Sequence, residues 1–184
     1  MPRSYHYVVL ASLVLLGLSG CVREEVDGST ITYSNELWVP LTALVGGIVA
    51  APAGWFLRNK SSRLGWVLMI LSPIVAFGIA PSLFLDRAVI DATHFSLRTG
   101  IWGLTAVHDV KFSELTLVRL ISEESRGRRG SKHTNYYLVC ERRDGTSAKV
   151  PLGNSVAEAA APRLIDRARS LNISVVNQTG QNGL

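Results

Sequence analysis

Apolar residues are concentrated in the first half of the chain, in three runs that all end before residue 86. The first run covers about ten residues within 8–18, which is too short to cross a membrane. Residues 37–57 and 64–85 form runs of 21 and 22 residues without a charge. At a rise of about 1.5 Å per residue, each can span a hydrocarbon core about 30 Å thick. The pattern therefore predicts two membrane-spanning helices joined by the short loop 58–63.

After residue 86 the pattern changes to short stretches in which apolar and polar residues alternate, which is typical of strands. The predicted strands are 88–91, 95–98, 107–111, 115–121, 136–141 and 146–151, with 173–176 as a candidate for a seventh. Asp144 and Gly145 predict a type I′ turn between the last two of the six. Asn154 or Ser155 can cap a following helix, which Pro162 is expected to bend.

The N-terminal segment has the three parts of a secretory signal. Arg3 lies in a start without acidic residues, the short apolar run follows, and residues 18–21 read Leu-Ser-Gly-Cys. This segment resembles bacterial lipoprotein signals. The resemblance implies that residues 1–20 are a signal peptide and that Cys21 becomes a lipidated first residue, which leaves Cys140 as a lone thiol. The alternative is an uncleaved signal anchor in which the cysteine is incidental.

Charges around the two apolar runs predict their orientation. The loop 58–63 contains Arg58, Lys60 and Arg63 and no acid, whereas segment 21–36 contains four acids against Arg23 alone. Short loops rich in Lys and Arg stay in the cytoplasm, so both outer ends of the hairpin should face the exterior. The sequence thus predicts a multi-pass protein of the bacterial inner membrane, with a short extracytoplasmic segment 21–36 and an extracytoplasmic domain 86–176. Neither run contains an ionisable residue, which argues against a transporter or channel.

Small residues recur at four-residue spacing in both runs, and this spacing lets helix backbones approach closely. They are Gly46, Ala50 and Gly54 in the first run, and Ser72, Ala76 and Ala80 in the second. Because the loop is short, we expect the two helices to pack against each other within one chain. Dimerisation through the same residues is the second reading.

The basic character of the chain comes from its second half. Residues 86–184 hold 14 Lys and Arg against 10 Asp and Glu, a net charge of +4 out of +5 for the whole chain. One stretch without acids contains Arg126, Arg128, Arg129 and Lys132. We interpret it as a loop that binds anionic headgroups, since basic residues near an anionic membrane surface contribute on the order of 1 kcal/mol each. The other reading is a solvated loop whose arginines pair with Glu123 and Glu124.

No group of residues in the sequence predicts a reaction. His94, His108 and His133 are isolated, with no metal-ligand spacing, and Ser131 lacks the surroundings of a hydrolase nucleophile. We therefore predict no catalytic residue, no metal and no cofactor. Nucleic acid is not expected as a partner, because the domain is predicted to lie outside the cytoplasm.

The order of six or seven strands and one helix, directly after a helical hairpin, resembles the bacterial pleckstrin-homology-like membrane proteins. The matching stretch is 86–176, with Phe95, Leu97, Arg98 and Gly100 in one strand and turn, Val110 and Phe112 in the next, the run 114–121, Asp144 and Gly145 in the hairpin, and then the capped helix. The resemblance implies an α+β chain with a small β-barrel or sandwich used for binding or assembly, and no catalytic residues. Residues 177–184 are expected to form a disordered tail.

These predictions combine into a functional hypothesis. The chain is expected to be a non-enzymatic envelope protein whose domain binds lipid headgroups or a protein partner at the membrane surface. The alternative is an assembly or accessory subunit of a larger membrane complex. The ligand, the partner and the oligomeric state are left open by the sequence.

Overall fold

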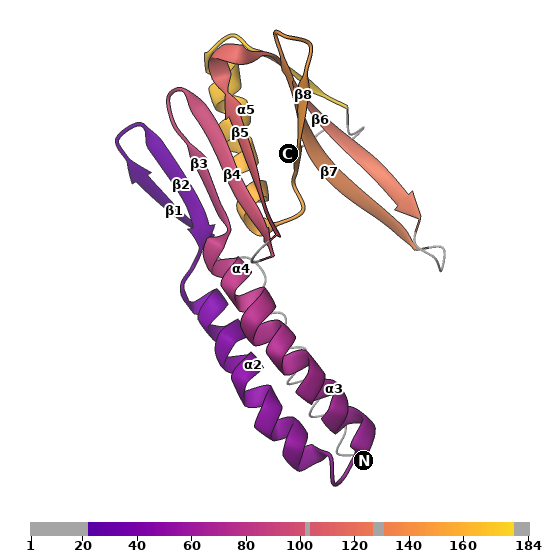
Figure 1. The fold of residues 1–184 in the computed structure, drawn as a ribbon. Coiled ribbons are helices and arrows are strands. Elements are labelled where there is room, and N and C mark those ends of the chain that lie inside the picture. The colour runs from indigo at the N-terminus through magenta and orange to yellow at the C-terminus, as the bar shows by residue number, and fades with distance from the viewer. Residues whose placement is uncertain (1–21, 102–103, 127–130, 179–184) are drawn as a thin grey trace, which may run out of the picture.

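The computed structural model describes residues 22–101, 104–126 and 131–178, and it has an α+β fold. Two apolar helices form a long hairpin that projects from a domain built of two β-sheets and one packed helix (Figure 1). Within the described ranges the two sheets do not close into a barrel, so the barrel form of the predicted domain is wrong. The lipobox with Cys21 lies outside the described residues, as do residues 179–184 of the predicted tail 177–184, whereas Asn177 ends the last strand.

The helical hairpin agrees with the two apolar runs. Helix α2 covers Trp38–Leu57. The second helix consists of α3, Ser62–Pro73, the π-helical segment η1, Ile74–Ile79, and α4, Ala80–Leu85. Both helices are long and apolar enough to cross a membrane. The π-helical turn begins directly after Pro73, which has no N–H to donate to the regular helical ladder.

Small residues do bring the two helices together, but not all of them are those expected. Ser72 is buried, and its hydroxyl donates a hydrogen bond of 2.6 Å to the carbonyl oxygen of Gly47. A Cβ added to Gly47 would lie 2.8 Å from the backbone nitrogen of Ala76, whereas one added to Gly46 would meet open space. The prediction of Gly46 at the interface is therefore wrong, because α2 presents the next residue to its neighbour.

The other predicted packing positions face inward to different degrees. Gly54 is buried and a Cβ there would lie 2.8 Å from the carbonyl oxygen of Gly65. Ala76 and Ala80 are buried, and Ala50 is half-buried. Most of the large apolar side chains of both helices are exposed instead. Small residues therefore line the interface between the helices, and large apolar residues cover the outer surface of the hairpin.

The same substitution at the two adjacent glycines tests this packing. Gly47→Ala should destabilise the hairpin by about 1–3 kcal/mol, since the added methyl group meets backbone atoms that cannot rotate away. Gly46→Ala should be neutral or stabilising by up to about 1 kcal/mol, because alanine favours the helix more than glycine does. Thermal unfolding of the full chain in detergent measures both. Equal melting temperatures for the two variants would contradict this packing.

Five strands form the first sheet, in the order β1-β2-β3-β4-β5, and all neighbours are antiparallel. They are β1 (Val22–Asp27), β2 (Thr30–Asn35), β3 (Arg87–Ile90), β4 (His94–Ile101) and β5 (Leu104–Lys111). Strand β2 precedes the helical hairpin and β3 follows it, and Thr32 is opposite Val89 in the ladder. The domain predicted to begin at residue 86 therefore also includes Val22–Asn35.

The second sheet has the order β8-β7-β6-β9. Its strands are β6 (Leu115–Arg126), β7 (Lys132–Arg142), β8 (Ser147–Pro151) and β9 (Ser174–Asn177), and a 3-10 turn η2 (Phe112–Glu114) leads into it. Strand β9 is parallel to β6 because helix α5, Ser155–Ser170, makes the crossover between β8 and β9. Helix α5 continues through the exposed Pro162.

One hydrophobic core joins both sheets and α5. Its fully buried members include Leu97 from β4, Val118 from β6, Leu138 from β7, and Ala160 and Leu164 from α5. Helix α5 packs against strands of both sheets, which explains why alternating strands and one apolar helical face fold into a single unit.

The turn between β7 and β8 differs from the predicted type I′. Gly145 has a φ of +82°, but Asp144 is not among the described residues with positive φ. Arg142 donates to the carbonyl of Thr146, and Gly145 donates to the carbonyl of Arg142. This is the pattern of a three-residue loop with a glycine bulge, in which Asp144 instead accepts hydrogen bonds from the backbone and side chain of Thr146.

Candidate membrane interface

The domain has two ends, and the helical hairpin leaves from one of them, here called the helix-side end (Figure 1). Because each antiparallel turn reverses the chain, successive turns alternate between the two ends. The β4–β5 and β6–β7 connections therefore lie toward the helix-side end, and the β3–β4 and β7–β8 turns lie toward the far end. Strand β1 also begins at the helix-side end, where Val22 is opposite Asn35.

Hydrogen bonds fasten the helices to the domain at this end. The Asn35 side-chain amide donates to the carbonyl oxygen of Leu83 in α4 at 2.9 Å, which joins the entry and exit of the hairpin. A second hydrogen bond, from the Asn154 amide to the Thr99 hydroxyl at 2.7 Å, joins the start of α5 to β4. The same Asn154 caps α5 by accepting from the Ala157 N–H, as the sequence predicted for either Asn154 or Ser155.

Asp86, the residue after α4, completes this junction. Burial raises the pKa of its carboxyl, and hydrogen bonds from the Thr99 side chain and the Gly100 backbone oppose that rise only in part. Its Oδ1 is buried and has no hydrogen-bond partner among the described residues. A partly buried, incompletely paired carboxylate disfavours its own ionised form.

Replacement of Asp86 by Asn should make the stability of the folded chain less sensitive to pH. Because the Asp86 pKa is higher in the folded chain than in the unfolded chain, the folded state binds the proton first, and folding gains stability as pH falls through this range. Asp86→Asn, which has no charge to bury, should therefore melt above the wild type at neutral pH, and the difference should shrink on acidification. Thermal unfolding of the full chain between neutral and mildly acidic pH measures this.

Asp144→Asn is the matched control for this experiment. Hydrogen bonds from the Thr146 side chain and backbone lower the pKa of Asp144, so its ionised form stabilises the fold and that contribution is lost as pH falls. The two variants should thus deviate from the wild type in opposite directions at neutral pH. A melting temperature of Asp86→Asn below the wild type at neutral pH would contradict the stated role of burial.

Two of the four predicted headgroup-binding residues, Arg126 and Lys132, flank the connection between β6 and β7. Arg128 and Arg129 lie outside the described residues, and Arg126 is described only as the last backbone position of β6. Lys132 begins β7 and is exposed, with its Nζ 3.5 Å from Glu124 Oε2. The other nearby acid, Glu123, lies 2.6 Å from the Nζ of Lys149. Both acids that the sequence offered as partners for the arginines therefore already contact lysines.

The loop end of the helical hairpin carries its own aromatic and basic group. The guanidinium carbon of Arg58 lies 4.9 Å from the ring centre of Trp55 and 5.8 Å from that of Trp66. Cation–π contacts of this kind hold a charged head beside amphipathic rings. Tryptophan is also the residue type that favours the headgroup level of a bilayer.

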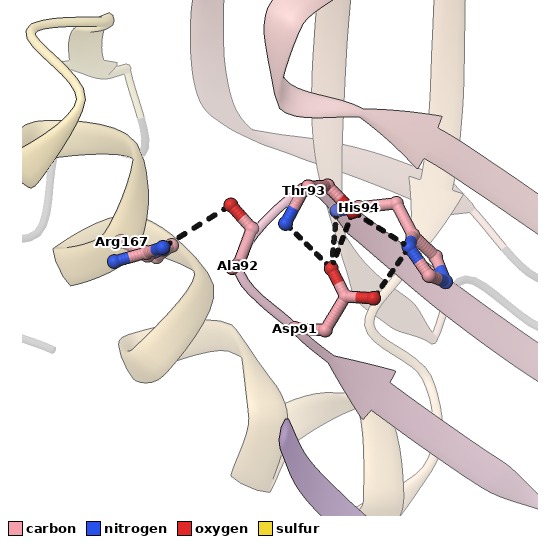
Figure 2. Close-up of polar contacts among 5 residues, drawn as sticks. All are labelled: Asp91, Ala92, Thr93, His94 and Arg167. Carbon is pink, nitrogen blue, oxygen red and sulfur yellow. Dashed lines mark hydrogen bonds and ion pairs between the residues drawn. The ribbon is translucent and has the colours of Figure 1, made fainter. Parts of the chain in front are cut away.

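The far end of the domain contains a polar cluster around the β3–β4 turn (Figure 2). Asp91 Oδ1 accepts from the backbone N–H groups of Thr93 and His94, both at 2.6 Å, and from the Thr93 hydroxyl at 3.0 Å. Its Oδ2 lies 2.6 Å from His94 Nδ1. Arg167 of α5 donates to the carbonyl of Ala92 at 3.1 Å. The Asp91 carboxylate thus stabilises the turn, so Asp91 and His94 have a structural role here.

A cleft of about 520 Å³ opens beside this turn. Its apolar lining includes Phe112, Leu115 and Ile173, and its polar lining includes Thr93 and the exposed Arg143. Such a lining can contact a small anion or an acidic chain, but it contains no base or nucleophile held in place for a reaction. Across the described part of the chain, no three His, Cys, Asp or Glu residues gather as metal ligands.

Cys140 lies in β7 and is fully buried in the core. Burial raises the pKa of its thiol to about 11, so almost none of it is thiolate at neutral pH. This makes Cys140 a packing residue, and it also makes the native thiol unsuitable as a reporter of which side of a membrane the domain occupies.

Comparison with protein-family models gives no match, and no curated protein is significantly similar to the chain.

Proposed function

We propose that the chain is a non-enzymatic, membrane-anchored protein of the bacterial envelope whose domain binds anionic lipid headgroups. One observation carries the proposal. The described strands β6 and β7, which flank the basic stretch in the sequence, run to the helix-side end of the domain, where a membrane surface would lie if α2 and α3–α4 cross the bilayer (Figure 1).

The surface of the helical hairpin supports membrane insertion. Its outward-facing residues are large and apolar, including Val45, Phe56, Ile70 and Phe77, all more than half exposed. In water such a surface would be costly, whereas in lipid it matches the solvent. The buried hydroxyl of Ser72 is satisfied by the carbonyl of Gly47, as a polar group within hydrocarbon must be.

The pairing of β2 with β3 supports a single location for both flanks of the hairpin, since strands that share a ladder lie on one side of a membrane. The basic loop 58–63 then favours the cytoplasm for the hairpin tip and the exterior for the domain. Lipidation at Cys21 fits this arrangement. Val22, its covalent neighbour, begins β1 at the helix-side end, so an acyl chain there would enter the same leaflet as the helix ends.

The charge of the β6–β7 end favours an anion. Glu123, Glu124, Lys132 and Lys149 balance one another, so the three arginines at 126, 128 and 129 supply a net charge of +3. Exposed lysine–glutamate pairs of this kind contribute little to stability, and they add no net charge to this end of the domain.

Removal of the three arginines tests headgroup binding. In Arg126→Ser/Arg128→Ser/Arg129→Ser, the affinity of the full chain in neutral detergent for a fluorescent phosphatidylglycerol should fall by up to roughly a hundredfold, at about 1 kcal/mol for each charge. Binding by the wild type should also weaken with added salt, because the contacts are exposed.

A matched variant controls for net charge. Lys111→Ser/Arg143→Ser/Arg169→Ser removes the same charge from the far end of the domain and should change the affinity less than about twofold. Unchanged binding in the first variant, or an equal loss in both, would refute a specific headgroup site. In that case, copurification of a partner after mild detergent extraction would favour the accessory-subunit alternative.

Cysteine labelling tests the proposed topology. Ser147, exposed at the start of β8, and Ser61, exposed in the hairpin loop, can each be replaced by Cys, while the buried Cys140 stays unreactive. A membrane-impermeant maleimide should label Ser147→Cys in intact spheroplasts and Ser61→Cys only after permeabilisation. The reverse result would place the domain in the cytoplasm. Mass spectrometry of the mature N-terminus would show whether Cys21 is acylated.

The pleckstrin-homology-like assignment remains part of this proposal. Seven strands follow residue 86, within the described ranges, and α5 packs on the core, which fits the resemblance. The added hairpin β1–β2 is a feature that the sequence pattern did not include, whereas β9 corresponds to the candidate seventh strand 173–176 and pairs parallel to β6.

A further inference from the structure

The tip of the β4–β5 hairpin exposes apolar side chains that belong to the core face of its sheet. Phe95 and Leu97 of β4 and Val110 of β5 are buried on that face. Residues directly opposite each other in an antiparallel ladder share a face, and successive pairs on one face are two residues apart. The pair Ile101 and Leu104 therefore continues the core face, yet these side chains are 59% and 80% exposed.

At this point the β4–β5 hairpin extends beyond the hydrophobic core that covers the rest of its sheet. Helix α5 packs against β1, β2, β3 and β9, and its first residue, Ser155, follows the Asn154 that bonds to Thr99 of β4. Ile101 and Leu104 lie beyond Thr99, toward the tip, where α5 has not yet begun. Two large apolar side chains at the end of a hairpin are thus left without a cover from their own chain among the described residues.

The location of Ile101 and Leu104 in the fold indicates what covers their exposed side chains. Helix α4 packs against β4, which runs to Ile101, and Asp86 is the first residue after α4. The tip therefore lies beside the end of the apolar hairpin, next to α4 with its exposed Phe84 (Figure 1). Ile101 and Leu104 therefore add a second apolar surface beside the apolar surface of the helices.

We infer that Ile101 and Leu104 insert into the interfacial region of the bilayer and form a second, shallow membrane contact of the domain. The inference rests on the proposed membrane crossing by the helical hairpin. It differs from the headgroup site in chemistry, because it needs apolar lipid and no anionic charge. Together with Asp86 and Thr99 at its base, this contact would fix the tilt of the domain on the membrane and hold the β6–β7 end at the headgroups.

Depth-dependent quenching tests the inference in the full chain, reconstituted in nanodiscs of zwitterionic lipid. A Cys21→Ser background leaves the buried Cys140 as the native thiol, and a fluorophore is attached at Leu104→Cys, Val107→Cys or Phe77→Cys. Val107 is the matched control. It is 62% exposed on the same hairpin, but it lies on the opposite face of the sheet and farther along β5 from the tip than Leu104 does. Phe77 is 71% exposed in the middle of the second helix and reports membrane insertion itself.

Lipids with a nitroxide near the headgroup should quench the Leu104 label at least about threefold more strongly than the Val107 label. Lipids with a nitroxide deep in the acyl chain should quench the Phe77 label most. Equal weak quenching at Leu104 and Val107, with Phe77 still quenched, would overturn the inference and leave the anchor intact. No quenching at Phe77 would overturn both.

A pyrene label separates lipid from a second copy of the chain. Excimer emission from Leu104→Cys at one chain per disc is not expected, and emission that rises with the number of chains per disc would assign the tip to self-association and overturn the inference. Because zwitterionic lipid is used, failure of the arginine variants to alter phosphatidylglycerol binding has no bearing on this result.

Discussion

The ladder between β2 and β3 is the constraint on which the rest of the structure depends. These strands are separated in sequence by the whole helical hairpin, and their hydrogen bonds require the chain to return to its starting point after residue 85. That return is possible because small residues let α2 and the second helix pack closely, with Ser72 bonded to Gly47. The Asn35 bond to Leu83 then fixes the point at which both helices meet the sheet.

Because both helices leave from the same end of the domain, the two ends of the domain differ in character. Antiparallel turns alternate between the helix-side end and the far end, so three different features come to lie toward the helices: the start of β1, the apolar β4–β5 tip and the basic β6–β7 end. If Cys21 is lipidated, as proposed, an acyl chain, apolar side chains and arginines would each suit a different depth of a bilayer. The far end instead holds a fixed polar turn around Asp91 and an open cleft beside Arg143.

Local patterns were a good guide to the elements after residue 36, but they missed the N-terminal hairpin formed by β1 and β2. The charge-free runs and the alternating segments correspond to the helices and to β3–β8, because burial of one face requires a regular apolar period. Strand β1 lacks that period, since it is an edge strand whose residues after Val22 are exposed. A turn signal was present nonetheless: Gly28 has a φ of +59° between Asp27 and Thr30, which are opposite each other, and a glycine at that position favours a two-residue hairpin.

The sequence by itself determined the helix lengths, most of the strands, the cap at Asn154 and the net positive charge of the β6–β7 end, because these follow from local period and composition. The tertiary structure alone decided that Val22–Asn35 joins the domain, that Gly47 rather than Gly46 meets the second helix, and that Glu123 and Glu124 contact lysines. Each of these depends on which distant segment comes near, and a one-residue rotation of a helix or the register of a strand pair is set by packing between elements.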